Sequence, residues 1–89
     1  MNLVCTERFE EQLKDILEEM IEIDIKQARD FKSYLEALII NIPTKVKKYK
    51  TSIYYSDADV KDLQYDGYTI PFLHNEETEG YLILEIIKI

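Results

Sequence analysis

Apolar residues recur at helical spacing in the first half of the chain and at strand spacing in the second half. The first stripe predicts a helix from about Glu7 to Met20 or Glu22, since apolar residues three and four apart share one helix face. Its members are Phe9, Leu13, Ile16, Leu17 and Met20. A second stripe predicts a helix from about Ile25 to Asn41, and it consists of Ala28, Phe31, Leu35, Leu38, Ile39 and Ile42. Two such helices joined by a very short turn form an αα-hairpin.

Polar residues mark where these helices begin, and a proline marks an end. Thr6 and Asp24 precede the two stripes and are predicted N-caps, because their side-chain oxygens can accept a backbone N–H of the first turn. Pro43 is expected to end the second helix, since its ring removes a donor and restricts the residue before it. Residues 2–6 are predicted to form a short, half-buried edge strand.

After Pro43 the pattern changes to one typical of strands. Four strands are predicted, at Thr51–Ser56, Val60–Tyr65, Tyr68–Leu73 and Tyr81–Ile87. Asp66-Gly67 is a strong hairpin signal, because glycine tolerates the positive φ of a tight turn. Pro71 predicts an edge strand or a bulge, since proline cannot donate to a ladder. Tyr81–Ile87 is apolar except for Glu85, which predicts a central strand covered on both faces.

The predicted fold class is therefore α+β, with the order β-α-α-β-β-β-β. A helical hairpin packs on one face of a mostly antiparallel sheet, within a single domain of residues 1–89. The lone Cys5 rules out an intrachain disulfide and fits a reducing compartment. The sequence shows no signal-peptide pattern and no apolar run of about 20 residues, so we expect a cytoplasmic protein without a membrane segment.

Charge is distributed unevenly along the chain. The net charge is -7, yet residues 43–62 carry five lysines against three aspartates, a net of +2. Lys45, Lys47, Lys48 and Lys50 have no acid among them. The acidic average argues against broad, nonspecific nucleic-acid binding, whereas the lysine run predicts a local surface for phosphates or for an acidic protein segment. The alternative interpretation is a solubilising loop between helix and sheet.

The second half also carries short motifs in a distinctive order. They stand at Tyr49–Asp57, Val60–Leu63, Gly67–Ile70 and Tyr81–Ile87. In this order and spacing the chain resembles the RelE/ParE superfamily of bacterial toxins, of the plasmid-stabilisation, type II toxin–antitoxin kind. The resemblance spans essentially the whole chain, and it implies the fold class given above.

The resemblance implies one of two activities. RelE-like members cleave messenger RNA at the ribosome, whereas ParE-like members poison DNA gyrase, and both are neutralised by a cognate antitoxin protein. The chain departs from the ribonuclease pattern: Thr69 stands where an arginine is common, Arg8 and Arg29 fall in predicted helices, and the chain ends at Ile89, where ribonuclease members continue. These departures favour a ParE-like or attenuated toxin; an active ribonuclease and a non-toxic, antitoxin-binding homologue stay open, as does a homodimer.

Candidate site residues follow from the lysine run and the resemblance. Lys45, Lys47, Lys48, Lys50, Lys61 and Tyr54 are predicted to bind nucleic acid or a protein partner. If the chain cleaves RNA, Lys50, Lys61 and His74 are the candidate catalytic residues, because cleavage needs an acid, a base and a cation at the phosphate. The alternatives are that Lys61 protects an edge strand and that His74 is an idle surface imidazole.

Other side chains are assigned mainly structural roles. Tyr54, Tyr55, Tyr65 and Tyr68 could stack on bases, although strand tyrosines usually pack at a sheet boundary. Asp57, Asp59 and Asp62 lack the spacing of an EF-hand, and there is no cysteine–histidine cluster, so neither a metal nor a cofactor is predicted.

Overall fold

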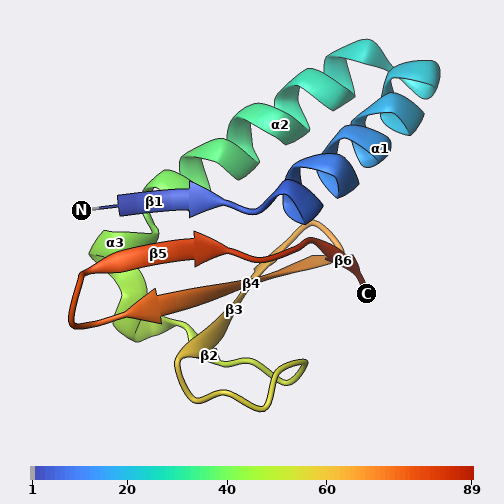
Figure 1. Ribbon diagram of the computed structural model, residues 1–89. Helices are drawn as coiled ribbons and strands as arrows, with labels where there is room; N and C mark the ends of the chain where they lie inside the picture. The colour runs from blue at the N-terminus through green and yellow to red at the C-terminus, as the bar shows by residue number, and fades with distance from the viewer. Residues whose placement is uncertain (1) are drawn as a thin grey trace.

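The computed structural model describes residues 2–89, which form a helical hairpin over a sheet (Figure 1). The helices are α1 (Glu7–Ile23), α2 (Ile25–Ile40) and α3 (Ile42–Lys45), followed by the 3₁₀ turn η1 (Val46–Lys48). The strands are β1 (Asn2–Cys5), β2 (Lys50–Thr51), β3 (Val60–Tyr65), β4 (Tyr68–Asn75), β5 (Gly80–Ile83) and β6 (Ile87–Lys88). No helix in this described range is both long and apolar enough to cross a membrane.

Both predicted N-caps are confirmed. The Thr6 hydroxyl oxygen accepts the Phe9 N–H at 3.0 Å, and the Asp24 carboxylate accepts the Lys26 N–H at 2.9 Å. Each cap replaces a hydrogen bond that the first turn of a helix cannot make internally. Asp24 is at once the last residue of the connection and the cap of α2, which is why one residue suffices to join the two helices.

The segment after α2 corrects one prediction. α2 ends at Ile40, close to the predicted Asn41, but the chain continues as the short helix α3 and the turn η1. Pro43 lies in the first turn of α3, where a missing N–H costs nothing because that N–H has no intrahelical acceptor. Lys45, Lys47 and Lys48 therefore stand on helical turns and not in a loop.

The sheet has the strand order β1-β5-β4-β3-β2, with β6 pairing with β4. The β1–β5 pair is parallel and the other pairs are antiparallel. β1 lies at an edge, as predicted. Asp66 and Gly67, at φ 50 and 84, form the tight β3–β4 turn, and both positive values are those of a type I′ hairpin.

Pro71 lies in a central strand, so of the two predicted alternatives the edge position is wrong. The pairing register shifts by one residue beside it, between Phe72↔Ile83 and Thr69↔Ile87, as the other alternative, a bulge, implies. β4 pairs with β3 on one side, and on the other side with β5 at residues 72–75 and with β6 at residues 68–69. Pro71 falls between these two partners, where no ladder hydrogen bond from its nitrogen is needed. Its carbonyl still accepts the Leu84 N–H at 2.9 Å. The proline is tolerated because β4 changes partner at that residue.

Two predicted strands are shorter than expected. β2 covers only Lys50–Thr51, and residues 52–59 are irregular. The predicted strand Tyr81–Ile87 is divided into β5 and β6 by residues 84–86. Side chains of the first helix region supply hydrogen bonds at this break: the Thr6 hydroxyl donates to the Leu84 carbonyl at 2.6 Å, and Gln12 accepts the Ile86 N–H at 2.9 Å. The break is therefore stabilised by contacts distant in sequence.

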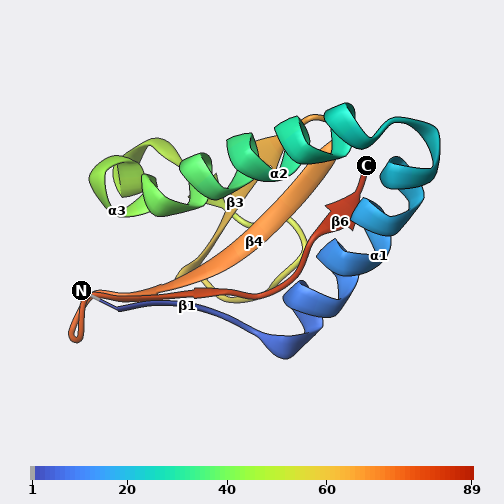
Figure 2. The same cartoon turned by 90° about the horizontal axis from the view of Figure 1, so that it is seen from above.

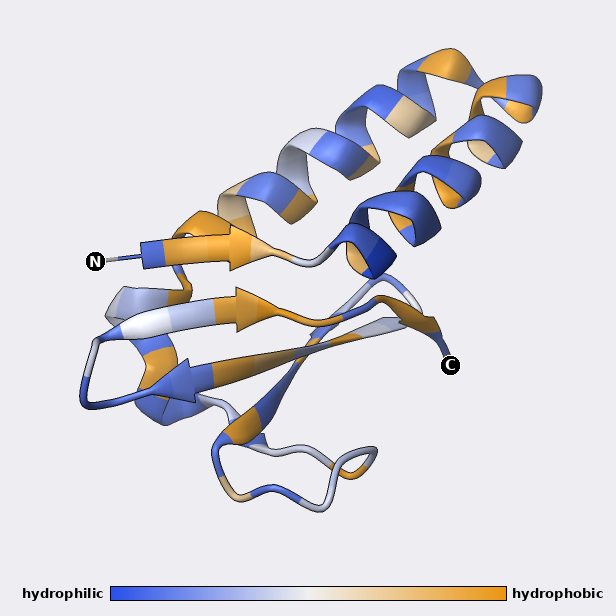
Figure 3. Cartoon of the chain, in the orientation of Figure 1, coloured by the Kyte–Doolittle hydropathy of each residue, from blue (hydrophilic) through white to orange (hydrophobic). Residues whose placement is uncertain are grey.

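The core lies between α2 and the sheet (Figure 2). Its most buried members include Leu35, Ile42, Leu63, Ile70, Phe72 and Ile83. In Figure 3 hydrophobic and hydrophilic residues alternate around α1 and α2, which is the pattern expected of apolar stripes. α1 buries only Phe9 completely, and the tip of the hairpin, with Ile23 84% exposed, projects beyond the sheet.

Candidate partner-binding surface

The lysine groove is a cavity of about 550 Å³ between α2, η1 and the β2 end of the sheet. Lys45, Lys48 and Lys50 line it, together with the apolar side chains of Leu38, Leu63 and Ile53. Lysines from three successive elements meet there because the chain turns back toward the sheet directly after η1. The groove thus combines three cationic groups with an apolar lining.

These lysines carry their charge without internal compensation. All three are exposed, and none has a carboxylate within ion-pairing distance in the part of the chain that the structure describes. Asp62 lines the same groove, and its carboxylate accepts the Ile53 N–H at 3.1 Å through one oxygen. Its other oxygen, Oδ1, is buried without a hydrogen-bond partner among residues 2–89. The groove therefore offers free ammonium groups at its rim and one unsatisfied acceptor inside.

Lys47 and Lys61 lie outside this groove. Lys47 is exposed on η1 and lines a shallower surface made by residues 43–48 alone. Lys61 lies two residues before the buried Leu63 on β3, so both side chains point to the helix-covered face of the sheet, and Asp62 points to the opposite face. Its Nζ donates to the Tyr49 carbonyl at 3.3 Å, which ties the connection after η1 to β3.

His74 occupies a third location, near the far end of β4. Its ring stacks on Tyr81 with centroids 4.5 Å apart and planes 5° from parallel. The two rings line a cavity of about 330 Å³ with Pro43, Val46, Glu76 and Glu79. Burial, and then the nearby Glu79 carboxylate, raises the pKa of Tyr81. Neither Lys50 nor Lys61 lines this cavity, so the structure does not bring the three candidate catalytic residues into one space.

The tyrosines have different surroundings. Tyr54 is 44% exposed in the irregular segment after β2, where its ring is accessible to a partner. Tyr65 and Tyr68 pack against Phe31, at centroid distances of 5.1 and 5.6 Å, which assigns them to the core boundary. Burial raises the pKa of Tyr65, and neighbouring Asp66 adds to the effect.

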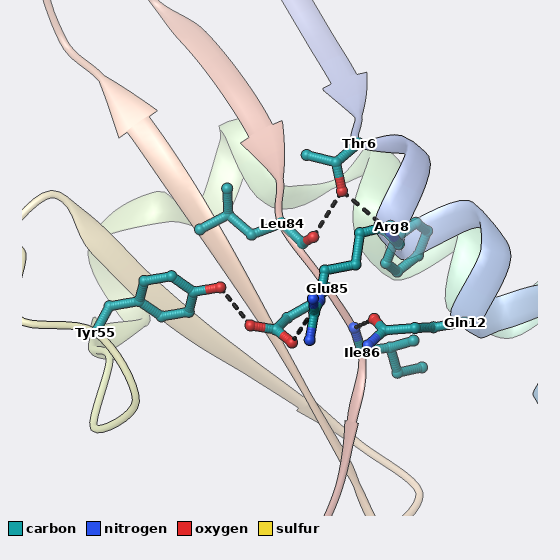
Figure 4. Close-up of polar contacts among 8 residues, drawn as sticks. Thr6, Arg8, Gln12, Tyr55, Leu84, Glu85 and Ile86 are labelled. Atoms are coloured by element: carbon teal, nitrogen blue, oxygen red, sulfur yellow. Dashed lines mark hydrogen bonds and ion pairs between the residues drawn. The ribbon is translucent and has the colours of Figure 1, made fainter.

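Tyr55 belongs to a polar cluster that the sequence did not reveal (Figure 4). Its hydroxyl donates to the Glu85 carboxylate, and the other oxygen of Glu85 accepts the Arg8 Nε–H at 3.3 Å. Burial, followed by the hydrogen bond to Glu85, raises the pKa of Tyr55 to about 12. The cluster holds the irregular segment, the β5–β6 break and α1 together. Its signal in the sequence was Glu85, the single charge in an apolar run.

Acidic side chains of this region accept hydrogen bonds from backbone N–H groups. Asp57 accepts the Asp59 N–H at 2.9 Å and so shapes the turn before β3. Over residues 2–89 no three histidine, cysteine, aspartate or glutamate side chains gather so as to hold a metal ion. Cys5 is a half-buried free thiol beside the core, and burial, then Glu10, raises its pKa.

Comparison with known proteins yields a likeness of fold. No protein-family model matches the chain, and no curated protein matches it in sequence. Nine chains of solved structures match it in fold. One belongs to the chromosomal ParDE TA (toxin–antitoxin) system from P. aeruginosa, with a TM-score of 0.77 and 14% identity over 100% of this chain and 96% of that one. The predicted RelE/ParE-like fold is therefore confirmed.

Proposed function

We propose that the chain is the toxin-like component of a type II toxin–antitoxin system, which inhibits growth by binding a macromolecular target and is neutralised by a cognate antitoxin. The observation that carries this proposal is the full-length likeness to a chain of the ParDE system, with a TM-score of 0.77. The motif order at Tyr49–Asp57, Val60–Leu63 and Gly67–Ile70 supports it independently, because it rests on sequence and not on backbone shape.

The surface of the molecule fits a protein-binding role. A chain with a net charge of -7 has three lysines around one partly apolar groove, and none of them has an ion-pair partner among residues 2–89. Charges of this kind steer an oppositely charged partner and select its orientation, while apolar contacts supply binding energy. An antitoxin that places acidic and apolar side chains in the lysine groove matches both features.

The arrangement favours binding over RNA cleavage. Lys50 lies in the lysine groove, Lys61 donates to the Tyr49 carbonyl, and His74 stacks on Tyr81 beside a separate cavity. Cleavage needs acid, base and cation within reach of one phosphate. Ribosome-dependent cleavage by these three residues remains the alternative, and loss of cleavage of translated messages on replacing all three by alanine would support it.

Controlled expression in a bacterial host tests the proposal. Induction of the chain alone should stop growth, and co-expression of the product of the adjacent open reading frame should restore it. A variant with Leu35→Asp, which places a charge in the core, serves as the unfolded control. Normal growth under induction of the folded chain would refute toxicity. A stable complex with the neighbouring product without any toxicity would instead identify a non-toxic, antitoxin-binding homologue.

A further inference from the structure

β1 forms one edge of the sheet, and its outer side is unpaired (Figure 1). The Thr6 N–H, directly after β1, donates to the Ile83 carbonyl of β5 at 3.0 Å. Backbone groups alternate in direction along a strand, so those of residues 2 and 4 also face β5, and those of Leu3 and Cys5 face outward. No other strand within residues 2–89 pairs with β1. Two N–H and two C=O groups are therefore available to an added strand.

The surroundings of this edge carry no charge. Proteins commonly protect an open edge with charged side chains, yet all four residues of β1 are uncharged in a chain with 33% charged residues. Val4, Leu73 and Leu82 line a cavity of about 280 Å³ beside β1, and none of the residues lining this cavity is charged. The edge is thus a neutral, mostly apolar part of an acidic molecule (Figure 3).

An apolar row crosses the sheet and ends at β1. Val4 pairs with Leu82, Leu82 pairs with Leu73, and Leu73 pairs with Val60. Leu3 packs against the core, so Val4, its neighbour on the strand, lies on the opposite face of the sheet, away from the helices. Val60 is buried, whereas Val4 is 55% exposed. The row therefore ends in an apolar side chain that lacks a neighbour on its outer side.

We propose that β1 pairs in antiparallel orientation with β1 of a second copy of this chain, about a two-fold axis that passes beside Val4. The two sheets then join into one, with the helices of both copies on the same face. A two-fold contact uses the same surface of each chain, so that surface must be complementary to itself. This inference is independent of the proposed function, because it involves neither toxicity nor an antitoxin.

The sequence of β1 is complementary to itself in this orientation. The register that uses both outward-facing residues places Leu3 opposite Cys5 of the second copy, with about four hydrogen bonds between the strands. Val4 then lies opposite Val4 of the second copy, and Asn2 opposite Thr6, so apolar side chains face apolar ones and polar face polar. Through the two valines the apolar row continues from one chain into the other.

Charge favours a second copy over a charged partner at this edge. Two chains with a net charge of -7 repel each other, so they approach most easily where neither surface is charged. The lysine groove selects partners by charge, whereas the β1 edge has no charged group with which to select one. Each copy contributes only a four-residue strand and the end of the apolar row. Such a small contact predicts a weak dimer that forms with increasing concentration.

Disulfide trapping tests the predicted register. Residues in the position of the two Val4 side chains have Cα atoms about 4.5 Å apart, which a disulfide can span. Val4→Cys in a Cys5→Ser background should form a disulfide-linked dimer under mild oxidation. It should do so at least about tenfold faster than Ile23→Cys in the same background, because Ile23, 84% exposed at the hairpin tip, lies far from the axis. The wild-type chain should not crosslink, since Cys5 lies opposite Leu3.

Sedimentation analysis gives a second readout. The mass of the wild-type chain should rise with concentration from 10.6 kDa toward twice that value. Val4→Lys should remain monomeric, because it places two like charges opposite each other across the axis. Ile21→Lys, which adds the same charge at a site 50% exposed on α1, is the matched control and should associate like the wild type. Thermal unfolding checks that each variant folds.

Each contrary result overturns the inference. Val4→Cys that crosslinks no faster than Ile23→Cys would exclude close approach of the two strands. A wild-type mass of 10.6 kDa at every concentration would exclude the dimer. A dimer that withstands Val4→Lys would use another surface, and rapid crosslinking of the wild-type chain through Cys5 would show another register. None of these measurements depends on growth inhibition, so the inference and the proposed function can fail separately.

Discussion

Replacing Tyr55 by phenylalanine removes one oxygen from a cluster that joins three distant parts of the chain. The lost interaction is the hydrogen bond from the Tyr55 hydroxyl to Glu85, a carboxylate with only 15% of its side chain exposed. Hydrogen bonds to charged groups contribute about 1.5–3 kcal/mol. Among residues 2–89, the Glu85 carboxylate would keep only Arg8 as a partner, and the Arg8 side chain is 71% exposed. We expect the free energy of unfolding to fall by about 2 kcal/mol, which lowers Tm by roughly 10 °C.

The pH dependence of this loss gives a sharper test. The pKa of Tyr55 is raised to about 12, first by burial and then by Glu85, from an ordinary value of 10.0. The folded state therefore binds the proton more tightly than the unfolded chain. The stabilisation is fully present below pH 10 and is lost as the pH rises toward about 12. The stability difference between wild type and Tyr55→Phe should shrink across that window, while the titration of the other tyrosines is common to both proteins.

Urea denaturation followed by circular dichroism, repeated from pH 7 to pH 11.5, measures this difference. Tyr34→Phe is the matched control, because Tyr34 is 68% exposed and its hydroxyl makes no hydrogen bond within residues 2–89; its variant should stay within about 0.5 kcal/mol of the wild type. A Tyr55→Phe protein as stable as the wild type at neutral pH, or a stability difference that stays constant up to pH 11.5, would refute this account of the cluster.

Three further substitutions test the fold. Thr6→Ala should lower the free energy of unfolding measured by urea denaturation by about 1–2 kcal/mol, because the hydroxyl both caps α1 and donates to the Leu84 carbonyl. Thr6→Ser should retain most of this stability, and an alanine variant as stable as the wild type would contradict the assigned role. Leu35→Ala, at a fully buried site, should lower the free energy of unfolding by about 2–5 kcal/mol, whereas Ile23→Ala, at an exposed site, should lower it by less than about 0.5 kcal/mol. Equal losses would contradict the assignment of Leu35 to the core. Gly67→Ala should lower the free energy of unfolding by about 1 kcal/mol, which lowers Tm by several degrees. The backbone φ of 84 is the cause, since a Cβ there meets no atom within 4 Å. Gly67→Asn should be less destabilising, and the reverse order would contradict the type I′ turn.

Local signals predicted much of the backbone. The stripes that include Phe9 and Phe31 predicted both long helices, and Thr6 and Asp24 predicted their starts, because periodicity and capping depend on residues a few positions apart. The Asp66-Gly67 turn was predicted for the same reason. The Pro71 signal left two structures open, an edge position or a bulge, and only the tertiary structure decided between them: β5 and β6 pair with β4 on either side of Pro71, in registers that differ by one residue.

The candidate surface was only partly accessible to sequence reasoning. The lysine run drew attention to residues 45–50, but the sequence could not show that Lys45, Lys48 and Lys50 share a groove while Lys47 points elsewhere. The sequence placed Lys61 on a strand and Lys50 just before one. In the structure they stand on opposite faces of the β2–β3 pair, because Lys50 pairs with Asp62. Grouping of side chains from different elements depends on strand register, which a local pattern does not encode.

The amino-acid sequence by itself determined the helical hairpin, the β3–β4 hairpin, the fold class and the location of the basic segment, since each depends on spacing or composition within a short window. Only the tertiary structure decided the course of residues 52–59, the break between β5 and β6, and the cluster of Tyr55, Glu85 and Arg8. Those features depend on hydrogen bonds between residues 30 to 78 positions apart. The tertiary structure also decided that β3 has an open edge at Gln64, because Lys48 belongs to η1 and does not pair with β3 there.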